Sequence, residues 1–169
     1  NINGIDGDLN GSGEGEEIHQ LASDKITEIQ KDYIRRVIDT VGDLDNVLFE
    51  ISNESNKHST AWQYAMIDYI HEYEKTKAKQ HPVAMTFHYQ DGKNSELFAS
   101  GAEAISPNPG ENKAYILAPP PADGSKVIIT DTDHLWGIGG NRKWVWKSFT
   151  RGLHPIFMDP LEPLVAARE

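Results

Sequence analysis

Apolar residues recur at spacings of three and four in two segments of the chain, which is typical of amphipathic helices. The first segment begins at Asp24, and its apolar positions are Ile26, Ile29, Tyr33, Ile34, Val37 and Ile38. They predict a helix of about 18 residues, capped by Ser23 or Asp24 and followed by Gly42. The second helix is expected to begin at Ser59 or Thr60. Its apolar positions are Trp62, Met66, Tyr69, Ile70 and Tyr73.

Short apolar runs lie between and after these helices and predict strands. They cover residues 46–52, 81–89, 126–133 and 154–160, and a third helix is expected over 142–152. Residues 90–125 are rich in Pro and Gly, so they are expected to be irregular apart from a short strand within 104–108.

Helices that alternate with short apolar strands predict an α/β fold with a mainly parallel sheet. The length of 169 residues suits one domain. We therefore expect a single domain over 1–169, in which an acidic, Gly-rich loop (1–24) precedes the alternating helices and strands (25–169).

The composition narrows the classes of partner. A formal net charge of −10 disfavours nucleic acid, whose phosphates require basic patches, and is compatible with neutral substrates such as sugars. Without cysteine there is neither a disulfide nor thiolate chemistry, but this does not fix the compartment. No apolar run approaches the ~18 residues of a membrane span.

Polar side chains stand where the predicted strands end, and those ends share one edge of a parallel sheet. Asn53 and Glu54 follow the first strand, and Asp131 and Asp133 follow the fourth. Glycoside hydrolases use two carboxylates that face each other across a cleft. The alternative is that Glu54 caps the following helix and Asp131 binds a backbone turn.

Other residues at the same edge are candidates for binding a sugar, by hydrogen bonds or by stacking on its apolar face. They are His88, His134, Trp136 and Asp159. For the two histidines and Trp136, packing in the core or in a loop is an equally good interpretation. Of Trp144 and Trp146, one is expected in the core. Glu50 is expected to be buried and paired, and not to carry the chemistry.

Two segments resemble clan A glycoside hydrolases, which are (β/α)8 barrels. "NVLFEISNES" (46–55) is similar to their fourth strand, which ends in an Asn-Glu pair, and residues 126–160 are similar to the region from strand seven to strand eight of bacterial cellulase-like and apiosidase-like barrels. The resemblance implies that Glu54 is the general acid/base and that Asn53 bonds the sugar 2-hydroxyl. It also implies that Asp131, with Asp133 nearby, is the nucleophile or base.

The chain departs from that family in two ways. Asp131 stands where the family has Glu, which is one methylene longer, so the resemblance leaves open a retaining or an inverting outcome. Only about five strands can be counted, whereas a TIM barrel closes with eight. The resemblance therefore implies a partial barrel, the C-terminal half to two-thirds of one, and a homodimer or higher homo-oligomer that covers the open sheet edges.

Two other functions remain as alternatives. A truncated, self-associating barrel with little or no catalysis would act as a scaffold or a carbohydrate-binding remnant. An esterase is disfavoured because Ser52, Ser55 and Ser59 lie in no G-x-S-x-G motif.

The stretch "DGDLNGSGEGEE" (6–17) fits the calcium pattern D-x-[DN]-x-[DN]-G-x5-E. Oxygens on alternate residues can converge on one cation, and Gly11 permits the turn. The expected ligands of a structural Ca2+ are Asp6, Asp8, Asn10, the Ser12 carbonyl and Glu17. A full EF-hand is not expected, because no helical pattern precedes Asp6. The alternatives are a disordered acidic leader and an acidic rim of the barrel that binds no metal.

Overall fold

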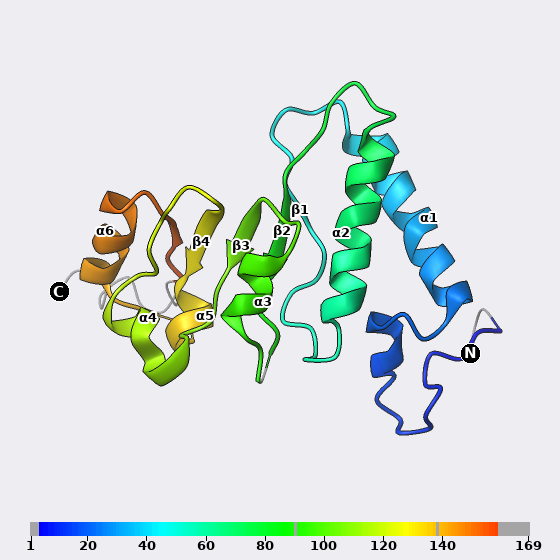
Figure 1. Cartoon of the computed structure of the whole chain (residues 1–169), viewed down its shortest axis with the longest axis horizontal. Coiled ribbons are helices and arrows are strands. Elements are labelled where there is room, and N and C mark those ends of the chain that lie inside the picture. The colour runs from blue at the N-terminus through cyan, green and yellow to red at the C-terminus, as the bar shows by residue number, and fades with distance from the viewer. Residues whose placement is uncertain (1–3, 90, 138, 159–169) are drawn as a thin grey trace.

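The structure, a computed structural model, describes residues 4–89, 91–137 and 139–158 (Figure 1). Helices and strands alternate along the chain. In order they are η1 (Glu16–His19), α1 (Asp24–Val41), β1 (Phe49–Glu50), α2 (Thr60–Glu74), β2 (Val83–Thr86), α3 (Asn94–Ala99), β3 (Ala104–Ser106), η2 (Glu111–Lys113), α4 (Ala114–Leu117), β4 (Val127–Asp131), α5 (Thr132–Trp136), α6 (Arg142–Thr150) and β5 (His154–Ile156).

The five strands form one sheet in the order β1-β2-β3-β4-β5, and every neighbouring pair is parallel. This confirms the predicted α/β fold with a parallel sheet. Each strand lies beside the one that precedes it in the chain, which is also the strand order of a (β/α)8 barrel. Figure 1 shows α1 and α2 at the β1 end of the sheet and α6 at the opposite end.

One face of the sheet packs against the helices. The register aligns Phe49 with Val83, and Met85 with Ile105 and Ile128. These side chains join Ile38 of α1 and Ile67 and Ile70 of α2 in the hydrophobic core. This face is apolar because the helices remove it from water.

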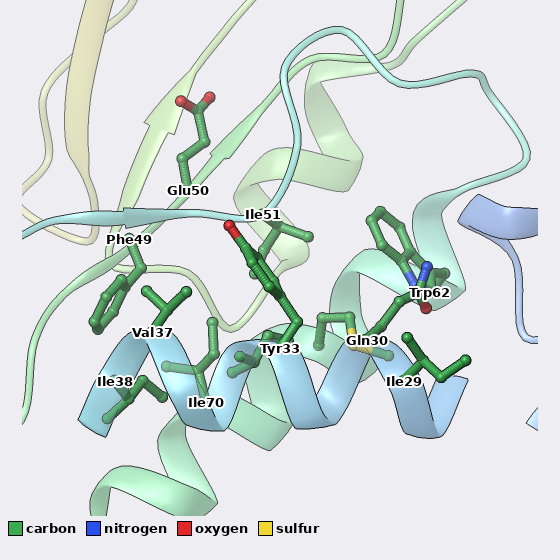
Figure 2. A pocket seen from close by; sticks show the side chains of 12 residues that line it. Ile29, Gln30, Tyr33, Val37, Ile38, Phe49, Glu50, Ile51, Trp62 and Ile70 are labelled. Carbon is green, nitrogen blue, oxygen red and sulfur yellow. The ribbon is translucent and has the colours of Figure 1, made fainter. Parts of the chain in front are cut away.

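Over β1 to β3, the other face of the sheet carries small or polar side chains. Glu50 is aligned with Ala84, Ala84 with Ala104, and Ala104 with Val127. Because side chains alternate between faces, Asp131 lies on the same face as Val127. Figure 2 shows Phe49 and Ile51 directed toward α1 and Glu50 directed away from it.

The two long helices match their sequence prediction closely. α1 runs from Asp24 to Val41 after Ser23, and α2 begins at Thr60 after Ser59. The two serines stand at the predicted N-cap positions, but neither hydroxyl makes a capping hydrogen bond. The last predicted helix also forms, as α6, and ends two residues before Gly152.

Two predictions need correction. Residues 90–125 contain the helix α3, which forms because Leu97 packs into the core under β3 and Ser100 closes its end. Glu50 is exposed, not buried, because its side chain on the edge strand β1 points away from α1 (Figure 2). Its carboxylate is paired all the same, because it accepts a hydrogen bond from the Thr86 hydroxyl of β2. The expected split between the two tryptophans is confirmed, with Trp144 buried and Trp146 exposed.

Candidate functional site

The loops that follow β1 and β2 meet at the carboxyl edge of the sheet. The backbone N–H of Tyr89 donates to the carbonyl of Ser55 over 3.0 Å, and the hydroxyls of Ser52 and Ser55 are in contact. Ser55 is buried. The segment around Glu54 is therefore held by a hydrogen bond to the neighbouring strand's loop as well as by its own serines.

Glu54 lies in this loop with a φ of 45°, a left-handed conformation that is uncommon for a residue with a side chain. Such strain persists only when the surroundings enforce it, and it gathers at functional sites. The Glu54 side chain is partly exposed, and Asn53 beside it is exposed. Both predicted residues thus reach the surface at the carboxyl edge. The short strand places Glu54 four residues beyond the end of β1.

His88 lies below this edge. Its side chain is 1% exposed, and its two ring nitrogens lie 3.4 Å from the Thr60 hydroxyl of α2 and 3.4 Å from the Glu96 carboxylate of α3. Burial lowers the pKa of His88, although Glu96 acts in the opposite direction. In this position His88 links β2 to two helices, and it is enclosed by protein.

The predicted residues after β4 are engaged with the backbone and with one another. One carboxylate oxygen of Asp131 accepts the N–H of Asp133 over 2.9 Å and so caps α5, as the structural alternative expected. Asp133 follows in the first turn of α5, partly exposed. Trp136 packs edge-on against Trp144, with ring centroids 5.0 Å apart. Asp159 is outside the described residues.

His134 connects the ends of three strands. Its Nδ1 lies 2.8 Å from the hydroxyl of Ser106 at the end of β3, and its ring meets Phe87 edge-on at 4.9 Å, just after β2. His134 itself belongs to α5, which follows β4. The structure therefore brings His134 to the edge where the sequence predicted it, and adds Ser106 as its partner. Only the strand register reveals that pairing.

A hollow of about 580 Å3, with several polar side chains in its wall, opens at the same edge, between the loops after β2 and β3 and the helix α4. Asn94 and Asn108 join the two loops: Asn108 N–H donates to Asn94 Oδ1 over 3.0 Å, and Asn94 Nδ2 donates to the Asn108 carbonyl over 3.2 Å. Lys93, Glu111 and Tyr115 also line it. Sequence reasoning missed this hollow because its walls come from a segment expected to be irregular.

Glu54 and Asp131 are separated by the width of the sheet. They follow β1 and β4, which are three strand spacings apart. At ~4.8 Å per spacing, a flat sheet would separate the two strand ends by about 14 Å. Both known glycosidase geometries need a carboxylate gap below ~9.5 Å. The two carboxylates would act together only if the sheet curves enough to bring them within that gap.

In Figure 1 the loop of residues 6–17 lies on the lower side of the molecule, as the β1–α2 loop does, and at the opposite end of the long axis from α4. Its backbone N–H groups turn inward: those of Ser12 and Gly13 donate to the Asp8 carboxylate over 2.9 and 2.8 Å. Within the described ranges, no three His, Cys, Asp or Glu side chains gather into a metal-holding group. Any cation here would need amide and peptide oxygens as well.

Comparisons with protein-family models, with curated proteins and with solved structures find no match. No helix in the described part of the chain is long and apolar enough to cross a membrane. The structure shows an α/β fold with five parallel strands, and what the site does is argued from its own residues.

Proposed function

We propose that this chain carries the carboxylate site of a glycoside hydrolase at the carboxyl edge of its sheet. Glu54 is the general acid/base, and Asp131 or Asp133 is the second carboxylate. Asn53 bonds a sugar hydroxyl. The observation that carries the proposal is the left-handed backbone of Glu54, held at the exit of β1 by the contact between Ser55 and Tyr89.

Two further points support this assignment. The Asn-Glu pair at the end of "NVLFEISNES" resembles the fourth strand of clan A glycoside hydrolases, and the strands follow one another in the order of a (β/α)8 barrel. The partial barrel would correspond to strands four to eight. In such barrels the catalytic groups stand at the carboxyl ends of the strands, as Glu54 and Asp131 do here.

The hollow beside Asn94 and Asn108 is the natural place for a sugar ring. Amide groups and the nearby Lys93 and Glu111 suit hydroxyl groups, and Tyr115 offers an aromatic face. His134 does not line this hollow, but it offers a ring nitrogen at the same edge of the sheet, because Ser106 contacts only the other one.

The hydrogen bonding of Asp131 limits its role as the second carboxylate. One oxygen of Asp131 already caps α5, so only its other oxygen is available to substrate or to a catalytic water. Asp131 also has a shorter side chain than Glu. A wide carboxylate gap would leave room for a water molecule and give inversion, and a narrow gap would give retention. The anomeric configuration of the first product, followed by NMR, distinguishes the two.

Glu54→Gln tests the mechanism, because the amide keeps the shape of the side chain and cannot transfer a proton. On an aryl glycoside that wild type cleaves, we expect turnover to fall by about 10²- to 10⁴-fold. Glu28→Gln is the matched control, since Glu28 is an exposed carboxylate on α1 that pairs with Lys31. Equal turnover in Glu54→Gln and wild type, with both folded, would rule out this role for Glu54.

A second candidate is a self-associating barrel fragment with little or no catalysis, a scaffold or a carbohydrate-binding remnant. It is favoured by an apolar groove of about 490 Å3 between α1 and the edge strand β1. Figure 2 shows Ile29, Tyr33 and Val37 along this groove. The occupant that we propose is a second copy of the chain, which covers the open edge. An oligomer that turns over no glycan supports this candidate over the hydrolase.

A further inference from the structure

The acidic loop of residues 6–17 has a buried carboxylate at its base. Glu17 is 7% exposed, and its Oε1 accepts the backbone N–H of Asn10, in the middle of the loop, over 3.1 Å. Its Oε2 is buried and has no hydrogen-bond partner. A buried carboxylate oxygen without a partner is costly, so this oxygen indicates a ligand at the loop.

The neighbouring oxygens stand on the same loop. Asp8 receives the N–H groups of Ser12 and Gly13, and Asn10 Oδ1 receives that of Ser12 over 2.7 Å. Asp6 Oδ1 accepts the N–H of Asp8 over 3.1 Å. A carboxylate has about four lone-pair sites, so each group that accepts one or two N–H bonds can still bind a cation.

We propose that this loop binds one Ca2+ ion through Asp6, Asp8, Asn10, the carbonyl of Ser12 and both oxygens of Glu17. The spacing of these residues matches the calcium-loop pattern, and the unpartnered Oε2 of Glu17 is independent of that pattern. In this structure Asp6, Asp8 and Glu17 do not gather into a group that holds a metal ion, so calcium would draw these three carboxylates together with the amide oxygen of Asn10 and the carbonyl of Ser12. The all-oxygen ligand set also disfavours zinc, which prefers His and Cys.

The proposed role of the calcium ion is structural: it stabilises the contacts between the loop and the helices α1 and α2. The carbonyl of Ile18, next to Glu17, accepts the side-chain amide of Gln30 on α1 over 2.6 Å, and Gln30 in turn accepts the indole N–H of Trp62 on α2 over 2.9 Å. His19 stacks near Trp62 with ring centroids 4.7 Å apart. A calcium ion that orders the loop therefore fixes the start of both helices. It also relieves the repulsion among five acidic residues.

The test uses calcium chloride alone, with the whole chain, and does not depend on glycosidase activity. We expect titration calorimetry to detect one site, and calcium at about 100 times its Kd to raise Tm by about 5–10 °C. Excess EGTA reverses the rise, and magnesium at the same concentration gives a much smaller one because it demands a tighter octahedral shell.

Two variants and a control locate the site. Glu17→Gln and Asp8→Asn should each weaken calcium binding at least about tenfold, whereas Glu16→Gln, an adjacent carboxylate outside the pattern, should bind as wild type does. If Glu17→Gln does not fold, Asp8→Asn in the exposed loop decides. No calcium heat and no change in Tm would overturn the proposal. So would wild-type affinity in Asp8→Asn, or equal losses in Glu16→Gln and the variants.

Discussion

At the scale of single residues, a buried pair near the amino end of β2 shows how one interaction holds several elements. His81 Nδ1–H donates to Glu74 Oε1 over 2.6 Å, and His81 Nε2–H donates to the carbonyl of Leu44 over 2.8 Å. Both ring nitrogens face acceptors, which favours the doubly protonated ring. The second Glu74 oxygen accepts the His81 backbone N–H over 2.8 Å. The bond to Glu74, and then that to Leu44, raise the pKa of His81.

This pair predicts a pH dependence of stability. Because the pKa of His81 is higher in the folded than in the unfolded chain, its contribution is complete below about pH 6.5, the unfolded value, and is lost as pH rises through the folded pKa. Urea unfolding of wild type at pH 6 and pH 8.5 should show this decline in the free energy of unfolding. In His81→Gln the decline should be smaller, while His58→Gln, which alters an exposed histidine, should keep it. The same slope in His81→Gln and wild type would contradict the assignment.

At the scale of elements, α3 shows how a helix can form where the sequence looks irregular. Its six residues include one fully buried apolar side chain, that of Leu97. The side chain of Glu96 accepts the N–H of Lys93 at the start of the helix, over 3.4 Å. So short a segment lacks the periodic repeat by which a helix is recognised, and packing against the sheet stabilises it.

Truncating this contact should therefore destabilise the fold. Leu97 is 1% exposed, so Leu97→Ala should lower the free energy of unfolding by about 2–5 kcal/mol through lost burial and the cavity left behind. Leu117→Ala is the matched control, since Leu117 of α4 is 76% exposed and should cost less than about 0.5 kcal/mol. Chemical denaturation measures both. Similar losses in the two variants would mean that α3 is not anchored as described.

At the scale of the whole molecule, the sheet formed by the described residues ends in two strands that each have a neighbour on one side only, β1 and β5. Apolar side chains are exposed at both ends, Tyr33 and Leu48 near β1 and Ile156 and Phe157 at β5. Unpaired backbone groups beside apolar surface favour association with another strand. The proposed second copy would cover this surface, and closing the sheet would also curve it, which bears on the gap between Glu54 and Asp131.

We therefore expect wild type to have a mass in solution of at least about twice 18.9 kDa by light scattering. Tyr33→Glu places a charge in the groove beside β1 and should shift the mass toward the monomer. Leu117→Glu, at a similarly exposed apolar position on α4 that does not line the groove beside β1, should leave the mass unchanged. A monomeric wild type at tens of micromolar would remove the self-association proposal and leave the hydrolase proposal standing.

Several parts of this protein could be predicted from the sequence because they depend on local pattern. The bounds of α1 follow from its apolar spacing, and β4 follows from the run before Asp131. The position of the polar groups at one edge follows from alternation of strands and helices, since parallel strands all end on the same side. The calcium pattern is likewise readable from spacing, although its ion remains a prediction.

Other features were decided by tertiary structure alone, because they depend on which distant segments of the chain pack against a side chain. Glu50 is exposed since its side chain points away from α1, and His88 is enclosed since α2 and α3 contact its ring. The left-handed backbone of Glu54 arises where two loops meet. The sequence by itself therefore determined which groups stand at the carboxyl edge. Only the packing of strands and helices, which brings distant segments into contact, decided which of them are buried, paired or open to a ligand.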